Sequence, residues 1–405
     1  MSAPARTAAA APPAQLIADD TEALAVAARL AAEFRTGAAE RDRERRLPHA
    51  EVDRLSGSGL LGITVPADHG GADVSAETLA EVFRLLATAD PSLAQIPQSH
   101  FVYTGVLRRQ GTPAQQEFFF REILAGRRLG NAQSEAGTRH IQDIRTRLTP
   151  AADGSLLLTG VKHYSTGALF AHWIPVLARA EDDTLQVAYV PRDAPGLTVV
   201  DDWDGMGQRT TASGTVRLER VRVPADRVVP HHLTFQGPQL HGATAQLLHT
   251  AIDTGIAAAA LEEAAAFVRT RSRPWFESGF ETAAEDPLLI QRFGELGIQL
   301  RAAEALLVAA ARAVDAATAD LTDDTAAEAS IAVAAAKAYA GTAAVDTGSA
   351  LFELAGTRAA LDGLGLHRYW RDARTHTLHD PARWKVQHIG RHLLNGTRPP
   401  RHGLL

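Results

Sequence analysis

The side chains best suited to chemistry in this chain of 405 residues are histidines that gather near its C-terminus. They are His367, His376, His379, His388 and His392. Two pairs among them have the three- or four-residue spacing that places side chains on one face of a helix, a spacing that metal sites use. The zinc-binding motif His-Glu-x-x-His is absent, however, and the nearby carboxylates are scattered. We therefore expect no metal site, and we expect His388 and His392 to lie on the surface.

Several reaction classes are excluded by what the sequence lacks. There is no cysteine, which rules out disulfides, thiolate metal sites, iron–sulfur clusters and a cysteine nucleophile. Glycine-rich phosphate loops and the Gly-x-Ser-x-Gly elbow of hydrolases are also absent. The 41 basic residues against 47 acidic ones give a net charge of −6, which disfavours nucleic-acid binding. Because no apolar run is long enough to span a bilayer, we expect a cytoplasmic protein without membrane contact.

The elements that would position the histidines fall into three blocks after a flexible tail at residues 1–15. Apolar residues at helical spacing predict an α-helical domain at 16–129, and short β-branched or alternating runs predict a small antiparallel β domain at 130–235. Residues 236–405 are alanine-rich and apolar on more than one stripe, which is typical of a helical bundle. The four helices expected there cover about 240–273, 286–318, 323–356 and 368–394. The fold class is therefore α+β.

Three short motifs add to this order of domains. They are Val-Pro-Ala-Asp-His-Gly-Gly at Val65–Gly71, Lys-His-Tyr-Ser-Thr-Gly at Lys162–Gly167, and Arg-Asp-Ala-Arg at Arg371–Arg374. Together with the helical, β and helical order, these motifs resemble the acyl-CoA dehydrogenase superfamily over residues 20–396. The resemblance implies an N-terminal α-helical domain, a middle β-barrel-like domain and a C-terminal four-helix bundle. It also implies a homotetramer.

Longer motifs resemble one branch of that superfamily, the flavin-dependent monooxygenases typified by dibenzothiophene monooxygenase and the SfnB family of sulfur-acquisition oxidoreductases. They cover Asp201–Gly214, Arg271–Trp275, Tyr369–Pro381 and Leu394–Gly396, and Tyr164–Trp173 is most like the SfnB family. The resemblance implies FMN rather than FAD as the cofactor, delivered as FMNH2 by a separate flavin reductase. It also implies that a C4a-(hydro)peroxyflavin formed with O2 oxygenates a small organosulfur substrate in sulfur acquisition.

The same resemblance implies a set of site residues. Catalytic roles would fall to His379, His376, His100 and Thr166, and flavin contacts to Asn131, Tyr164, Thr166, Trp203, Arg273 and Arg358. His379 would stabilise or protonate the flavin peroxide, and the Arg273 guanidinium would bind the cofactor phosphate across a subunit interface. Thr166 stands where dibenzothiophene monooxygenase has serine, and its extra methyl group would narrow the pocket toward a smaller substrate.

Other functions stay open from the sequence. An acyl-CoA dehydrogenase would use FAD and a carboxylate base, yet glutamate is missing from both family positions for that base, at Ala245 and within Leu378–Pro381. Asp380 could act instead, although it precedes Pro381 and has a shorter reach. A flavin-binding scaffold without turnover is a second alternative. The third is the same monooxygenase chemistry on nitrogen or carbon of a natural product.

Overall fold

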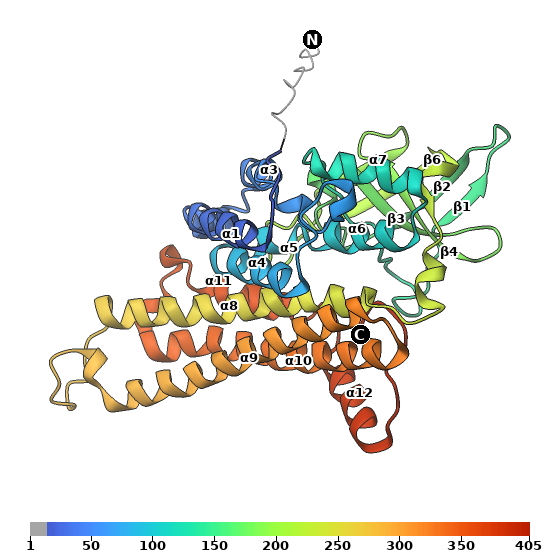
Figure 1. The fold of residues 1–405 in the computed structure, drawn as a ribbon. Coiled ribbons are helices and arrows are strands. Elements are labelled where there is room, and N and C mark those ends of the chain that lie inside the picture. The colour runs from blue at the N-terminus through green and yellow to red at the C-terminus, as the bar shows by residue number, and fades with distance from the viewer. Residues whose placement is uncertain (1–13) are drawn as a thin grey trace, which may run out of the picture.

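The structure, a computed structural model, describes residues 14–405, so most of the expected tail lies outside the described residues. The N-terminal helices lie above the C-terminal bundle and beside the β domain in the view of Figure 1. They are α1 (Asp20–Arg35), α2 (Ala38–Glu44), α3 (His49–Gly57), α4 (Ala76–Ala89), α5 (Pro91–Gln95), α6 (Gln98–Gln110) and α7 (Pro113–Leu124). Local sequence signals set their starts. The Ser75 hydroxyl accepts the N–H of Thr78 at the start of α4, and Thr112 and Gln115 form a reciprocal capping box on α7.

The middle domain is a mixed sheet. Its strands are β1 (Arg147–Pro150), β2 (Leu156–Lys162), β3 (Trp173–Arg179), β4 (Leu185–Pro191), β5 (Leu197–Val200), β6 (Thr215–Val223) and β7 (Val228–Val229), in the spatial order β5-β6-β2-β1-β3-β4-β7. β1 and β3 run parallel, which differs from the wholly antiparallel domain that the sequence predicts. The reason is that β1 and β2 form a hairpin, after which residues 163–172 cross to the other side of β1. This crossover carries Tyr164 and Thr166.

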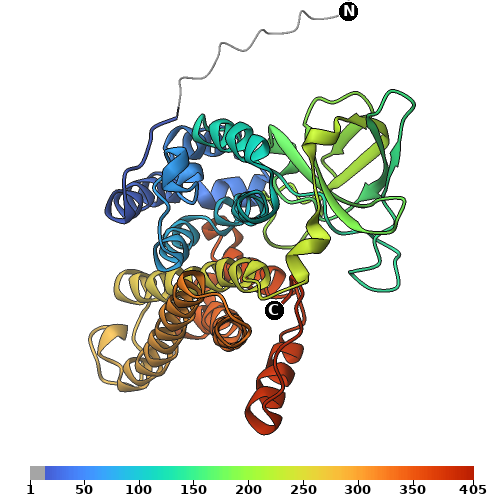
Figure 2. The same ribbon diagram turned by 45° about the vertical axis from the view of Figure 1, so that its right-hand side comes forward.

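The C-terminal domain contains α8 (His241–Arg271), α9 (Pro287–Ala319), α10 (Asp323–Ala355), α11 (His367–His376) and α12 (Ala382–Asn395). The first three helices match the expected ones, but the single fourth helix over 368–394 is wrong. The chain leaves helical geometry between α11 and α12, because Pro381 has no N–H to donate and disfavours the helical conformation of Asp380 before it. Figures 1 and 2 show α12 projecting away from the long helices after this break, which contains His379.

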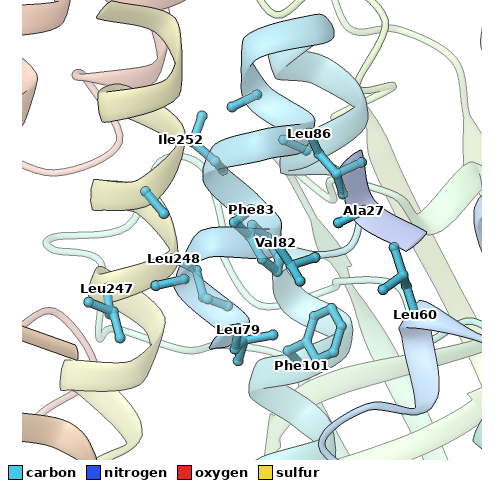
Figure 3. Close-up of a cluster of buried hydrophobic side chains, with 14 of the residues drawn as sticks. Ala27, Leu60, Leu79, Val82, Phe83, Leu86, Phe101, Leu247, Leu248 and Ile252 are labelled. Atoms are coloured by element: carbon cyan, nitrogen blue, oxygen red, sulfur yellow. The ribbon is translucent and has the colours of Figure 1, made fainter. Parts of the chain in front are cut away.

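The main core joins the N-terminal domain to the bundle. Leu79 and Phe83 of α4 lie against Leu248 and Ile252 of α8, and all four side chains are buried (Figure 3). Burial of each such side chain contributes about 1.5–3 kcal/mol, so this contact fixes α8, and the polar residues that α8 carries, against the N-terminal domain. Within residues 14–405, no helix is both long and apolar enough to cross a membrane.

Candidate active site

The crossover between β2 and β3 meets the loop after β5 in a chain of hydroxyl groups. The Thr166 hydroxyl lies 2.7 Å from that of Ser213, which in turn lies 2.7 Å from that of Thr211. Thr211 donates to the carbonyl oxygen of Gln208 at 2.9 Å, and the indole N–H of Trp203 donates to the same oxygen at 2.8 Å. Thr166 and Trp203, both expected beside the flavin ring, are therefore held by one hydrogen-bonded loop.

Two unusual backbone conformations shape the same crossover. Tyr164 has a φ of 55°, and its ring, 60% exposed, stands edge-on to that of Trp203 with the ring centroids 6.4 Å apart. Gly167 has a φ of 74°, and a Cβ there would lie 2.9 Å from the carbonyl oxygen of Ile96. Glycine is the residue that combines this conformation with so close an approach. The crossover that carries Tyr164 and Thr166 thus lies where the N-terminal and β domains meet.

Several buried polar atoms in the loop, in the crossover and at the start of the β domain have no protein partner within residues 14–405. Among the described residues, no protein atom pairs with Oδ1 of Asn131, with Oγ of Ser165 or with either amide atom of the Gln208 side chain. Such groups cost free energy unless a ligand or water satisfies them. An isoalloxazine ring presents N–H and carbonyl groups along its edge, so these side chains fit a bound flavin. Asn131 is an expected contact, and Ser165 and Gln208 are additional candidates.

The C-terminal histidines form a second group, in the bundle. His376 of α11 hydrogen-bonds through Nδ1 to Asp253 of α8 at 2.6 Å, and through Nε2 to Nδ1 of His249 at 3.0 Å. The ring of His379, in the break after α11, lies 4.0 Å from the ring of His249 between centroids. Asp253 also pairs with the ammonium of Lys337 on α10. The two expected histidines therefore belong to a larger cluster in which the rings contact one another and a carboxylate.

Burial decides the protonation of this cluster. Desolvation, followed by the neighbouring histidines and Lys337, holds the pKa of His249 well below its ordinary value. The pKa of His379 is also lowered, to about 4, mainly by the desolvation that its protein neighbours cause, although the residue itself is exposed in this chain. Burial acts to raise the pKa of Asp253, but the charge of Lys337 and the interactions with His376 outweigh it, and that pKa is lowered. At neutral pH, Asp253 is a carboxylate, and His249 and His379 are neutral imidazoles.

Helix α11 joins the two groups. The backbone N–H of Gln208 donates to the carboxylate of Asp372 at 2.6 Å. Arg371 donates to the carbonyl oxygen of Met206 at 2.6 Å and pairs with Asp42 of the N-terminal domain. Burial, followed by the nearby charge of Asp42, raises the pKa of Asp372 to about 7. The Arg-Asp-Ala motif thus binds all three domains together, one turn before the histidine cluster.

His100 is buried where the N-terminal domain meets the start of the β domain. Its Nε2 contacts the carbonyl oxygen of Leu61 at 2.8 Å, and its Nδ1 accepts the N–H of Leu129 at 3.0 Å. The backbone therefore uses both ring nitrogens of this buried residue. Desolvation lowers the pKa of His100 to about 4. The ring holds the N-terminal domain to the start of the β domain, and a catalytic role for it stays a prediction that requires one of these bonds to break.

The two expected arginines lie far from the histidine cluster. Arg273 follows the C-terminal end of α8, and Arg358 donates to the carbonyl oxygen of Arg271 at the same end of the bundle. His249 lies near the opposite end of α8, and at a rise of about 1.5 Å per residue the helix between His249 and Arg271 spans about 33 Å. Both expected arginines are exposed. Within one chain they cannot contact a flavin that lies beside His379.

Sequence reasoning missed three members of the cluster. His249 and Asp253 are four residues apart, so they lie on one face of α8, where they interrupt an apolar stretch. Lys337 interrupts the alanine-rich helix α10 in the same way. Buried charges are paired in folded proteins, so a charged residue inside an apolar helical run is a signal that could have found this cluster.

Comparisons with known proteins agree with this fold. Models of the acyl-CoA dehydrogenase N-terminal, middle and C-terminal domains match residues 19–127, 132–221 and 247–384. Dibenzothiophene monooxygenase of Rhodococcus erythropolis is 35% identical over 397 residues, covering 94% of this chain and 95% of that protein. The probable FMNH2-dependent monooxygenase SfnC of Pseudomonas putida is 33% identical over 93% of this chain and 96% of its own length.

The fold of this chain is also similar to that of a solved structure. FMN-bound TdsC from Paenibacillus sp. A11-2 matches with a TM-score of 0.90 at 34% identity, covering 95% of this chain and 100% of the other. The domain matches span most of the chain, and both full-length relatives are monooxygenases by name. The chain therefore belongs to the acyl-CoA dehydrogenase superfamily, as an enzyme of its FMN-dependent monooxygenase branch.

Proposed function

We propose that this enzyme uses FMNH2 and O2 to oxygenate a small organosulfur compound by way of a C4a-(hydro)peroxyflavin, in sulfur acquisition. The observation that carries the proposal is the neutral histidine cluster at the break after α11, where the rings of His379 and His249 lie 4.0 Å apart. Bound FMNH2 supplies the reaction with O2, and the protein has to position hydrogen-bond donors and exclude water. Neutral imidazoles are hydrogen-bond donors that add no charge to the site. The name of the Pseudomonas putida relative supports the reduced cofactor.

Five of the expected site residues have defined tasks in this proposal. Thr166 and Asn131 hydrogen-bond the edge of the flavin ring, and Trp203 covers a face of that ring. His379 donates its N–H to the oxygen atom that is transferred and later supplies the proton that leaves with water. His376 orients the neighbouring ring of His249 through the contact at 3.0 Å between their nitrogens.

Two observations support the proposed class of substrate: the substrate for which a relative is named, and the methyl group of Thr166. The Rhodococcus relative is named for dibenzothiophene, a fused aromatic sulfur compound. A threonine at this position keeps the hydroxyl but adds a methyl group beside it, which narrows the space next to the flavin edge. We therefore propose an alkyl sulfide, sulfoxide or sulfone smaller than dibenzothiophene as the substrate.

We also propose that two copies of the chain complete each flavin site, within a homotetramer. Arg273 and Arg358 are exposed at the end of the bundle far from His379, and a guanidinium binds phosphate bidentately. A partner chain that places this end beside the ring-binding loop supplies the phosphate contact. The side chains of Trp275 and Phe276, next to Arg273, are apolar and exposed, which supports their burial against another subunit. A separate flavin reductase in the cytoplasm delivers FMNH2.

An acyl-CoA dehydrogenase reaction has weaker support. The candidate base Asp380 is buried and accepts a hydrogen bond from the ammonium of Lys385 at 2.6 Å, which occupies one carboxylate oxygen. Ala245, at the other family position for the base, has no side-chain acid, and its carbonyl oxygen accepts the Gln98 amide at 3.2 Å. Neither position therefore offers a free carboxylate to remove a carbon-bound proton.

Oxygen-isotope labelling tests the proposed reaction. The purified chain, FMN and a flavin reductase with NADH are incubated under isotopically labelled O2 with an alkyl sulfide, a sulfoxide, a sulfone or dibenzothiophene. We expect mass spectrometry to find one labelled oxygen atom in the product of a small organosulfur compound, and none with the reductase alone. If no substrate takes up label while an acyl-CoA bleaches bound FAD, the protein is a dehydrogenase instead.

A further inference from the structure

Four buried residues behind His379 form a continuous hydrogen-bonded chain across three helices. The ammonium of Lys337 pairs with Oδ2 of Asp253, and Oδ1 of Asp253 pairs with Nδ1 of His376 at 2.6 Å. Nε2 of His376 then contacts Nδ1 of His249 at 3.0 Å. The exposed fractions of the four residues are 4% for Lys337, 0% for Asp253, 3% for His376 and 1% for His249. A buried ion pair adds little net stability. The function of this hydrogen-bonded chain is therefore to be sought in its effect on the two histidines.

The carboxylate determines which nitrogen of each ring carries a proton. The ionised Asp253 only accepts hydrogen bonds, so Nδ1 of His376 has to be protonated. A neutral imidazole has a single N–H, so a neutral His376 accepts at Nε2, and Nδ1 of His249 donates to it. Nε2 of His249 is left with a free lone pair, and no protein atom of residues 14–405 hydrogen-bonds it. The ring of His249, which ends this hydrogen-bonded chain, lies beside the ring of His379.

We propose that this chain is a proton relay that opens at Nε2 of His249, with Lys337 and Asp253 as its positioning residues. The inference rests on the proposed function, because oxygenation requires proton transfers at the flavin edge. A proton that binds to Nε2 of His249 makes this ring release its Nδ1 proton to Nε2 of His376. The resulting His376 imidazolium is stabilised by the Asp253 carboxylate, and the reverse transfers return the proton to the pocket.

Lys337 sets the charge of the relay. Its ammonium pairs with the Asp253 carboxylate and thereby weakens the attraction of this carboxylate for a proton on the neighbouring histidine rings. Among residues 14–405, the other charged groups that act on the cluster are Asp380 and Lys385, which pair with each other at 2.6 Å, and the remaining titratable neighbour is His379. Without the Lys337 charge, the buried carboxylate would be compensated by a histidine that takes up a proton.

The wild-type protein provides the first test. The full-length chain is labelled with nitrogen-15 histidine and studied by NMR, with the signals assigned through His249→Gln and His376→Gln variants. We expect protons on Nδ1 of both rings and a bare Nε2 on both at neutral pH. The opposite tautomer on either ring, or an imidazolium at neutral pH, overturns the relay.

Asp253→Asn tests the positioning role. An ammonium only donates, so the new amide oxygen turns to Lys337 and the amide NH2 turns to Nδ1 of His376. Both rings then switch tautomer, and Nε2 of His249 becomes protonated. We expect this switch in the NMR spectrum, a kcat lower by at least about 10²-fold, and an FMN dissociation constant within about twofold of wild type. Unchanged tautomers with unchanged kcat overturn the proposal.

A matched control and a second variant distinguish loss of the relay from a general loss of stability when a buried ion pair is broken. Glu135→Gln breaks a similarly buried pair with Lys162 in the β domain, and it should leave both tautomers as in wild type. Lys337→Met keeps the apolar stem but removes the charge, so the acid limb of the kcat–pH profile should move to higher pH; an unmoved limb contradicts the role of Lys337. The proposed function fails separately, when the wild-type chain yields no labelled sulfur product although its tautomers are as expected.

Discussion

The backbone N–H of Gln208 donates to the buried carboxylate of Asp372 over 2.6 Å, and this bond couples two halves of the site that come from different domains. On one side, the hydroxyl chain that starts at Thr166 ends at Gln208. On the other side, the histidine cluster begins one turn after Asp372, at His376. The distance between Thr166 and the histidines therefore depends on this junction.

Asp372→Asn should change how stability depends on pH. Folding raises the pKa of Asp372 to about 7, whereas an unfolded aspartate releases its proton near pH 3.9. Between these values the folded state binds more protons, so this group lowers the stability of the wild type as pH rises from about 4 to about 7. The asparagine amide oxygen still accepts the Gln208 N–H but does not titrate. In denaturant unfolding, the variant should equal wild type near pH 4 and exceed it by on the order of 4 kcal/mol near pH 8. Parallel stability–pH curves for the two proteins would contradict this.

Thr166→Val should lower turnover by removing a hydroxyl at nearly constant shape. The change breaks the 2.7 Å hydrogen bond to Ser213. A lost hydrogen bond of about 1–1.5 kcal/mol corresponds to a loss of about 10-fold in kcat. Thr166→Ser is the matched control, because it keeps the hydroxyl and removes the methyl group. It should retain activity on a small sulfone and raise kcat/KM for dibenzothiophene. Full activity of Thr166→Val would show that the hydroxyl does not act on the flavin.

Mixing two impaired variants should restore activity if subunits share each site. Arg273→Ala removes the proposed phosphate contact from one chain, and His379→Ala removes the proposed proton donor from the other. In a hybrid of the two variants, some sites receive both intact residues, so co-expression should recover about a quarter of the wild-type sites after random pairing. Activity is measured with saturating flavin reductase. A mixture no more active than the better single variant argues that each site lies within one chain.

His100→Ala should damage folding more than chemistry. It leaves the Leu61 carbonyl oxygen and the Leu129 N–H unpaired and opens a cavity in a buried region. We expect a loss of about 2–4 kcal/mol in the free energy of unfolding and a kcat of the folded enzyme within about threefold of wild type. A variant of wild-type stability with a kcat about 10²-fold lower would instead make His100 a catalytic residue.

The domain order could be predicted because it depends on local periodicity, which the sequence carries residue by residue. The long alanine-rich helices α8, α9 and α10 and the Ser75 cap of α4 are such local features. The parallel pairing of β1 with β3 could not be predicted, since it depends on which side of β1 the chain takes after residue 162. The break between α11 and α12 was signalled by Pro381, but the helical periodicity on both sides masked it.

The candidate site could be predicted only in part. Thr166 and Trp203 lie in recognisable motifs, and the structure joins them through one hydrogen-bonded loop. Asn131 lies outside those motifs, and its Oδ1 is buried without a protein partner among residues 14–405. The contact between His249 and His376 joins residues that are 127 positions apart, and no local pattern predicts such a contact. The relay behind His379 therefore became visible only in three dimensions.

Anaerobic stopped-flow spectroscopy tests the monooxygenase proposal most directly. The purified chain with bound FMNH2 is mixed with O2, and absorbance is followed at the band of the flavin C4a-peroxide. We expect a long-lived transient in the wild type and in the control His392→Ala. The His392 ring contacts the carbonyl oxygen of Thr397, just beyond the end of α12. In His379→Ala the lifetime of the transient should fall at least about 10-fold. No transient in the wild type, together with reduction of bound FAD by an acyl-CoA, would contradict the proposal and make Asp380 the candidate base of a dehydrogenase.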